Sequence, residues 1–129
     1  MYIVIAAHGH LADALVESAR MITGYQGDDL FALNMTFDKG MDALVSEASE
    51  ILGRDPDGEY LVLADLFGAS PFNSCLSAFR SSNYRLITGV NVPIVLEAIL
   101  TKDDADLDTL WNTLAEVGAE SVRKVHMVA

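Results

Sequence analysis

The amino-acid sequence predicts an α/β protein, an open three-layer α/β/α sandwich built on a mostly parallel sheet. Short apolar runs rich in β-branched residues alternate along the chain with segments whose apolar residues recur at helical spacing. Runs that are apolar at successive positions are typical of strands buried on both faces. Strands that alternate with helices form βαβ units with right-handed crossovers, which place helices on both faces of the sheet. We expect the strand order 2-1-3-4.

The first part of the chain predicts a strand, a helix and a second strand. Residues 2–7 are the first apolar run. The helix after it should end near Gly24, since glycine favours the position just past a helix. Its apolar residues at helical spacing are Leu11, Leu15, Ala19 and Ile22. Residues 29–34 predict the second strand.

The second helix and the third strand follow from capping and turn signals. Asp38 can cap the helix because its carboxylate can accept a hydrogen bond from a free N–H of the first turn. We expect the helix to stop at Gly53, after a buried stripe of Met41, Leu44, Val45, Ala48 and Ile51. The sequence Asp-Pro-Asp-Gly at 55–58 predicts a turn. Residues 60–65 predict a third buried strand.

The last third of the chain predicts three helices, a strand and a tail. Ser70 is expected to be the N-cap of a helix with Pro71 in its first turn, where the missing N–H costs little. Residues 84–88 indicate the fourth strand and 92–101 a short helix. The final helix is indicated by Leu107, Leu110, Trp111, Leu114 and Val117. The tail 124–129 follows by a short connection and predicts an antiparallel strand.

Length and composition limit the classes of protein. The 129 residues suffice for one domain, 1–129, and half of them are apolar. The net charge of −11 argues against nucleic acid as a partner, because such sites need clustered Lys and Arg. No apolar run approaches the roughly 20 residues that span a bilayer, and no signal peptide is evident. The single Cys75 fits a reducing, cytoplasmic location.

Two reactive side chains lie at the carboxyl ends of neighbouring predicted strands. His8 follows the first strand and Asp65 ends the third. In the order 2-1-3-4 these strands flank the point where strand order reverses, which is where open α/β sheets bind ligands. We therefore expect His8 and Asp65 to face each other. The carboxylate would fix the tautomer of the histidine and stabilise the cation formed when its free nitrogen attacks.

An anion could be held beside this pair. Gly9 leaves space at the mouth of the first strand, and Gly68, Ala69 and Ser70 lead into a helix whose N-terminal N–H groups and dipole favour an anion. A nucleophilic histidine, an orienting carboxylate and an anion cradle together describe a phosphohistidine site. We expect Gly9, Gly68, Ala69 and Ser70 to bind the phosphoryl group.

Other interpretations of the same residues remain open. His8 could be a partly exposed loop residue without a chemical role, and Ser70 could be an N-cap, a phosphate contact or both. A metal is not expected, because no Cys or third His is placed near His8 and His10, and His10 should turn away onto the first helix. We expect no cofactor. No Gly-x-Gly-x-x-Gly sequence follows the first strand, which argues against a dinucleotide.

Three stretches of the sequence carry a resemblance to a known family. These are AAHGHLADAL, LADLFGASPFN and ITGVNVPIVLEAIL. In order and spacing they resemble the signature stretches of the mannose-type (mannose/fructose/sorbose) enzyme IIA of the bacterial phosphoenolpyruvate-dependent sugar phosphotransferase system (PTS). The likeness extends from Met1 to about Lys124. The family often has Ser or Thr where this chain has Ala7, and Gly-Gly where it has Gly68-Ala69.

The resemblance implies a phosphotransferase that works through a phosphohistidine. It implies that His8 accepts a phosphoryl group from the phosphocarrier protein HPr and passes it to enzyme IIB for sugar uptake, with Asp65 and Ser70 at the family's acidic and serine positions. It also implies a cytoplasmic protein that associates with a membrane permease complex, and a homodimer in which the tail strand is exchanged. We expect enzyme IIB to be a separate polypeptide. Which sugar is transported does not follow from the sequence.

Three other functions compete with this one. The phosphotransfer subunit of a dihydroxyacetone kinase system resembles the same fold with an equivalent histidine. A signalling receiver domain has an aspartate at the end of strand three, but it needs an acidic pair after strand one to hold magnesium, where this chain has Ala6, Ala7 and His8. A non-catalytic binding domain is the third possibility.

Overall fold

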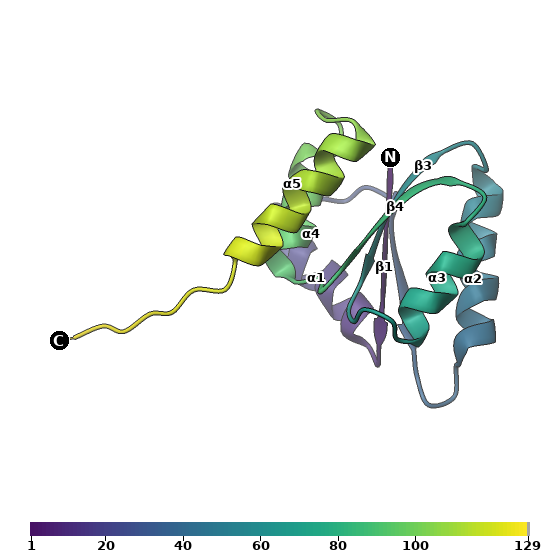
Figure 1. Ribbon diagram of the computed structural model, residues 1–129, viewed down its shortest axis with the longest axis horizontal. Coiled ribbons are helices and arrows are strands. Elements are labelled where there is room, and N and C mark those ends of the chain that lie inside the picture. Colours follow the sequence, from purple (N-terminus) through teal and green to yellow (C-terminus); the bar gives the residue numbers. More distant parts are fainter. Residues whose placement is uncertain (129) are drawn as a thin grey trace.

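The protein is a three-layer α/β structure built on one parallel sheet, as the sequence predicts (Figure 1). The computed structural model describes residues 1–128. Its four strands pair in the order β2-β1-β3-β4, all parallel. The elements are β1 (Tyr2–His8), α1 (Leu11–Thr23), β2 (Leu30–Met35), α2 (Met41–Arg54), β3 (Glu59–Ala64), α3 (Ser70–Phe79), β4 (Asn83–Thr88), α4 (Val92–Thr101) and α5 (Leu107–Glu120).

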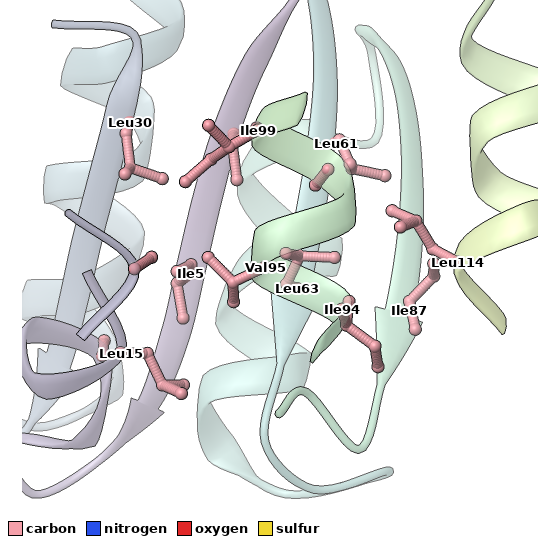
Figure 2. Packing of buried hydrophobic residues seen from close by; sticks show 14 of the residues in the cluster. Ile5, Leu15, Leu30, Leu61, Leu63, Ile87, Ile94, Val95, Ile99 and Leu114 are labelled. Atoms are coloured by element: carbon pink, nitrogen blue, oxygen red, sulfur yellow. The ribbon is translucent and has the colours of Figure 1, made fainter. Parts of the chain in front are cut away.

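The two central strands form the centre of the core. Residues 3–7 of β1 and 60–64 of β3 are completely buried, because both strands have neighbours on either side and helices on both faces. Successive side chains alternate between the faces. Ile3, Ile5 and Ala7 pack with α1, α4 and α5, whereas Val4 and Ala6 pack with α2 and α3. Figure 2 shows part of the first of these clusters, with α4, which carries Ile94, Val95 and Ile99, lying along the strands.

Apart from the tail strand, the predicted helices and strands are present, with small differences at their ends. The α4 helix has the predicted bounds, and Gly24 ends α1 with a φ of 71° and its N–H donating to the Arg20 carbonyl. The prediction that Asp38 caps α2 is wrong, since the N-cap is Gly40. Gly53 does not stop that helix, which continues to Arg54 because glycine tolerates helical geometry at a modest cost.

Several residues assigned to the core are on the surface. Leu11, Ile22, Met41 and Trp111 are exposed, and Ala12 takes the buried place at the start of α1. The spacing of these apolar residues is helical, but each lies at the margin of the stripe that faces the sheet. Periodicity identifies the helix and leaves the width of its buried face open.

The predicted tail strand is not formed in this single chain. Residues 121–128 have no regular secondary structure and extend away from the body of the protein (Figure 1), and Ala129 lies outside the described residues. Val122, Val125, Met127 and Val128 are all highly exposed.

Candidate functional site

The end of the sheet places His8 beside Asp65. His8 is the last residue of β1 and pairs in register with Met35 of β2. On the other side, the pairing of β1 with β3 ends at Ala6 and Ala64, and the next N–H, that of Asp65, donates to the Ala6 carbonyl at 3.2 Å. Asp65 therefore begins the loop directly next to the end of β1. The expected proximity of the two residues is confirmed.

The carboxylate of Asp65 holds both the backbone and the ring of His8. Asp65 Oδ2 accepts a hydrogen bond from the His8 backbone N–H at 3.0 Å and lies 2.8 Å from the His8 Nδ1 atom. The histidine side chain is 48% exposed, whereas that of the aspartate is only 14% exposed. The contact therefore joins a buried acceptor to a ring that solvent and other molecules can reach.

The electrostatics of the pair favour an ionised Asp65. Burial alone would raise the pKa of the Asp65 carboxyl group, but the hydrogen bonds from the His8 backbone and ring outweigh it and lower the pKa below its ordinary value. An ionised carboxylate can only accept hydrogen bonds. The proton of a neutral His8 ring must therefore sit on Nδ1, which leaves the lone pair on Nε2.

The second carboxylate oxygen of Asp65 adds an unusual feature. Asp65 Oδ1 is buried and has no hydrogen-bond partner among the described residues. Leaving a buried acceptor unpaired costs about 1–3 kcal/mol.

The start of α3 follows Asp65 closely. Gly68 has a φ of 78°, in the region that glycine adopts most easily, and its carbonyl accepts a hydrogen bond from the Asn73 side chain at 3.0 Å. The N-cap is Ala69 and not Ser70, which is the first helical residue, and no side-chain hydrogen bond caps the helix. The first α-helical hydrogen bond runs from Asn73 N–H to the Ala69 carbonyl, so the N–H of Ser70 precedes it.

The loop between β1 and α1 opens a hollow on the other side of His8. Gly9 has a φ of 62°, and its N–H donates to the Met35 carbonyl at 2.7 Å. The hollow has a volume of about 490 Å³ and is lined by His8, Gly9, His10, Met35, Thr36 and Phe37. His10, at the N-cap of α1, lines the same hollow as His8.

Sequence reasoning also missed how α1 is held. His10 occupies the N-cap position without a side-chain hydrogen bond. The N–H of Asp13 in the first turn donates instead to the side-chain oxygen of Asn34, at 3.2 Å. Asn34 is the partner of Ala7 across β1 and β2, so the strand next to His8 supplies the cap. Asn34 could have been identified as the cap only from the register of β1 with β2, which is not evident from the sequence.

Within residues 1–128, no group of three or more His, Cys, Asp or Glu side chains is placed to hold a metal ion. Over the same residues, no helix has the length and apolar character needed to cross a membrane.

Comparison with known proteins identifies the family. Residues 2–115 match the model of the EIIA-man family, described as the PTS system fructose IIA component. The chain belongs to this family. It is therefore a IIA component of the phosphotransferase system, and the stretches around His8, Asp65 and Thr88 lie within the matched region.

Related proteins span several sugar systems. The chain is 32% identical over 122 residues to the PTS system fructose-specific EIIA component of Bacillus subtilis, covering 92% of this chain and 82% of that protein. It is 30% identical over 124 residues to the PTS system mannose-specific EIIAB component of Escherichia coli, covering 94% of this chain but only 38% of that longer protein.

Solved structures agree with this assignment. The mannose/sorbose specific IIA subunit of Enterococcus faecalis superimposes with a TM-score of 0.90 at 25% identity, covering 99% of this chain and 96% of that one. The fold and the strand order around His8 are thus those of a IIA subunit.

Proposed function

We propose that this IIA component is a phosphocarrier in which His8 accepts a phosphoryl group from phosphorylated HPr and passes it to a histidine of enzyme IIB. The observation that carries the proposal is the 2.8 Å contact between His8 Nδ1 and Asp65 Oδ2 at the carboxyl edge of the sheet. That contact leaves Nε2 as the nucleophile on a ring that is half exposed.

The pair supports a simple transfer in both directions. The lone pair of Nε2 attacks the phosphorus atom of the donor, the bond between phosphorus and the donor nitrogen breaks, and the donor nitrogen keeps the bonding electrons. The phosphorylated ring of His8 then carries a positive charge, which the Asp65 carboxylate stabilises through Nδ1–H. Transfer to enzyme IIB follows the same path, with the acceptor nitrogen as the attacking group.

The phosphoryl oxygens need donors nearby. In our proposal these come from residues 68–70 at the start of α3, where the N–H of Ser70 precedes the first helical hydrogen bond. Gly9, whose own N–H already donates to the Met35 carbonyl, leaves space for the phosphoryl group beside His8. The positive end of the helix dipole supports an anion at the same place. Ser70 can add its hydroxyl group, because its carbonyl and not its side chain accepts the hydrogen bond from Ser74.

Labelling tests this proposal directly. Incubation with phosphoenolpyruvate, enzyme I and HPr should transfer one phosphoryl group to the protein, and His8→Ala should abolish the label. His126→Ala is a matched control, because His126 lies in the exposed tail and should keep full labelling. Label that persists in a folded His8→Ala variant would show that another residue is the acceptor.

The sugar system is preferred to the other functions. The matched relatives carry the names of mannose-, fructose- and sorbose-specific components, which supports transport over a dihydroxyacetone kinase system. A receiver domain would need Asp65 free to accept the phosphoryl group, whereas its carboxylate is bonded to His8. We place the reaction in the cytoplasm, at a membrane permease complex.

We also infer a homodimer that uses the tail. β4 is an edge strand, and exposed strand edges tend to be paired or covered. A groove of about 490 Å³ lies along β4 and α5, with Leu86, Ile87, Trp111 and Gly118 among its lining residues. Such a groove could bury the exposed apolar residues of the tail, which would otherwise remain in contact with water. The tail of a second chain could pair with β4, as exchange between subunits requires no new interface chemistry.

A further inference from the structure

The outer edge of β4 is partly closed by side chains of the same chain. β4 pairs with β3 on one side only, and the backbone groups of successive strand residues point to opposite edges. Every second residue of β4 therefore offers its N–H and carbonyl to a further strand. The Leu86 carbonyl belongs to this set and accepts a hydrogen bond from Trp111 Nε1 of α5 at 3.0 Å. The Tyr84 carbonyl accepts one from Arg85 Nη1 at 2.7 Å, and Thr88 completes the set.

The indole ring of Trp111 stands where an added strand would have to lie. Neighbouring strands lie about 4.8 Å apart, so an added strand would place an N–H about 2.9 Å from the Leu86 carbonyl oxygen. The indole nitrogen already lies 3.0 Å from that oxygen. Two hollows follow this edge, one of about 490 Å³ that reaches Gly89 and one of about 390 Å³ that reaches Phe72. They share only Leu86 and Trp111 as lining residues, so the indole ring separates them.

The contacts that hold the ring are few and lie near the surface. Trp111 is 38% exposed, and its one N–H donor is the one that bonds to Leu86. The guanidinium carbon of Arg85 lies 5.9 Å from the centre of the ring, and Arg85 is itself bonded to Asp108 at 2.6 Å. Exposed contacts of these kinds are individually weak. The ring can therefore leave the edge when another donor reaches the Leu86 carbonyl.

The segment that fits the opened edge is the tail 122–128 of a second copy of this chain. The apolar side chains of this tail are all highly exposed, and the two hollows would join into one groove once the ring has left. The tail of the same chain is badly placed to fill it. Ser121, where the tail begins, is held at the end of α5 by a hydrogen bond from Asn91 Nδ2 at 2.9 Å, and the tail then runs away from its own β4 (Figure 1).

We propose that Trp111 is a displaceable plug of the β4 edge, which leaves the Leu86 carbonyl when the tail of a second copy pairs with β4. The inference rests on the proposed homodimer and goes beyond it, because pairing could also stop at Thr88 with the ring in place. In the single chain the plug covers an edge that would otherwise be open to unwanted pairing. In the dimer its release makes the whole of β4 available to the tail.

The single tryptophan of the chain makes the state of the plug measurable. Solvent exchange of its indole N–H is measured by NMR in the dimer and in a chain that lacks residues 124–129, in which the plug should stay in place. We expect exchange to be at least about fivefold faster in the dimer, because the hydrogen bond to Leu86 is then broken.

A substitution tests the competition independently. Trp111→Phe keeps an aromatic ring but removes the donor to the Leu86 carbonyl. Two plugs leave for each dimer formed, so losing one hydrogen bond in each chain should lower the Kd of the dimer at least about fivefold in sedimentation analysis. Thr109→Ala is the matched control, since Thr109 lies on the same helix and lines neither hollow. Its Kd should equal that of the wild type.

Every other outcome counts against the plug. An indole N–H that exchanges equally slowly in the dimer and in the shortened chain would show that the ring stays in place. An unchanged or higher Kd for Trp111→Phe would show that the indole does not compete with the partner strand. A dimer that survives loss of the tail, or a chain that stays monomeric at every concentration, would overturn the plug together with the proposed tail exchange. Labelling of His8 is measured separately, so the proposed phosphoryl transfer would stand in each of these cases.

Discussion

Replacing Asp65 by Asn tests whether the carboxylate works with His8 or merely fills space. The carboxylate accepts hydrogen bonds from the His8 backbone at 3.0 Å and contacts the ring at 2.8 Å. An asparagine side chain has nearly the same shape but carries no charge. If its NH₂ group faces the ring, it donates to Nδ1, which moves the ring proton to Nε2 and removes the attacking lone pair.

The size of the effect follows from these contacts. Loss of a positioned carboxylate typically lowers a rate about 10²- to 10⁴-fold. Each tenfold loss corresponds to about 1.4 kcal/mol in the barrier. The fold should survive, because the amide oxygen can still accept one hydrogen bond and the site lies at the edge of the sheet. We expect the free energy of unfolding to change by less than about 2 kcal/mol.

Rapid-quench measurement of phosphoryl transfer from phosphorylated HPr to His8 gives the rate, and urea unfolding gives the stability. Asp57→Asn is a matched control, since Asp57 is exposed in the turn before β3 at the opposite edge of the sheet. This control should transfer at the wild-type rate. A folded Asp65→Asn variant that transfers within about threefold of wild type would refute the reasoning and leave Asp65 with a structural role only.

Two further predictions concern stability and assembly. Deleting residues 124–129 should convert a dimer into monomers in sedimentation velocity, and an unchanged dimer would remove the tail from the interface. Lys102→Met should lower the free energy of unfolding by about 2–4 kcal/mol at pH 7, because the buried Lys102 ammonium bonds to Asp29 at 2.6 Å. Burial alone would raise the pKa of Asp29, but the hydrogen bonds from Lys102 and Tyr25 outweigh burial and lower this pKa. The pair therefore stabilises the fold at pH values above the ordinary pKa of about 3.8, and this contribution is lost as the pH falls below that value. Urea unfolding should show the mutant deficit shrinking near pH 3, and a constant deficit would contradict the pairing.

The sequence predicts the fold well because its signals agree with one another. Strand runs, helical spacing and glycine positions all indicate alternating β and α elements, and β1 is apolar at every position from Ile3 to Ala7. The errors concern helix boundaries, exposed positions at the margins of the helices, and the tail strand. Gly40 takes the place expected for Asp38, and Ala69 that expected for Ser70, because a cap depends on backbone angles that neighbouring residues decide.

The contact of His8 with Asp65 could also be predicted, because it requires only the strand order and the position of each residue at the end of its strand. The surroundings could not. Asn34 caps α1 from a neighbouring strand, and Phe37 lines the hollow beside His8, through contacts between segments distant in the chain. Their placement depends on the register of β1 with β2 and on the shape of one turn. Neither leaves a periodic signal in the sequence.

The proposed chemistry assigns different tasks to the rigid and the variable parts of the molecule. A phosphocarrier must gain and lose its phosphoryl group at one nitrogen, so donor and acceptor meet the same His8 and Asp65 pair, and that pair cannot distinguish them. The pair stands at the ends of β1 and β3, where buried strands fix its geometry. Discrimination must therefore come from the surface around it, which consists of loops. Loops tolerate change more readily than buried strands do, which lets a IIA component acquire new partners without disturbing the transfer itself.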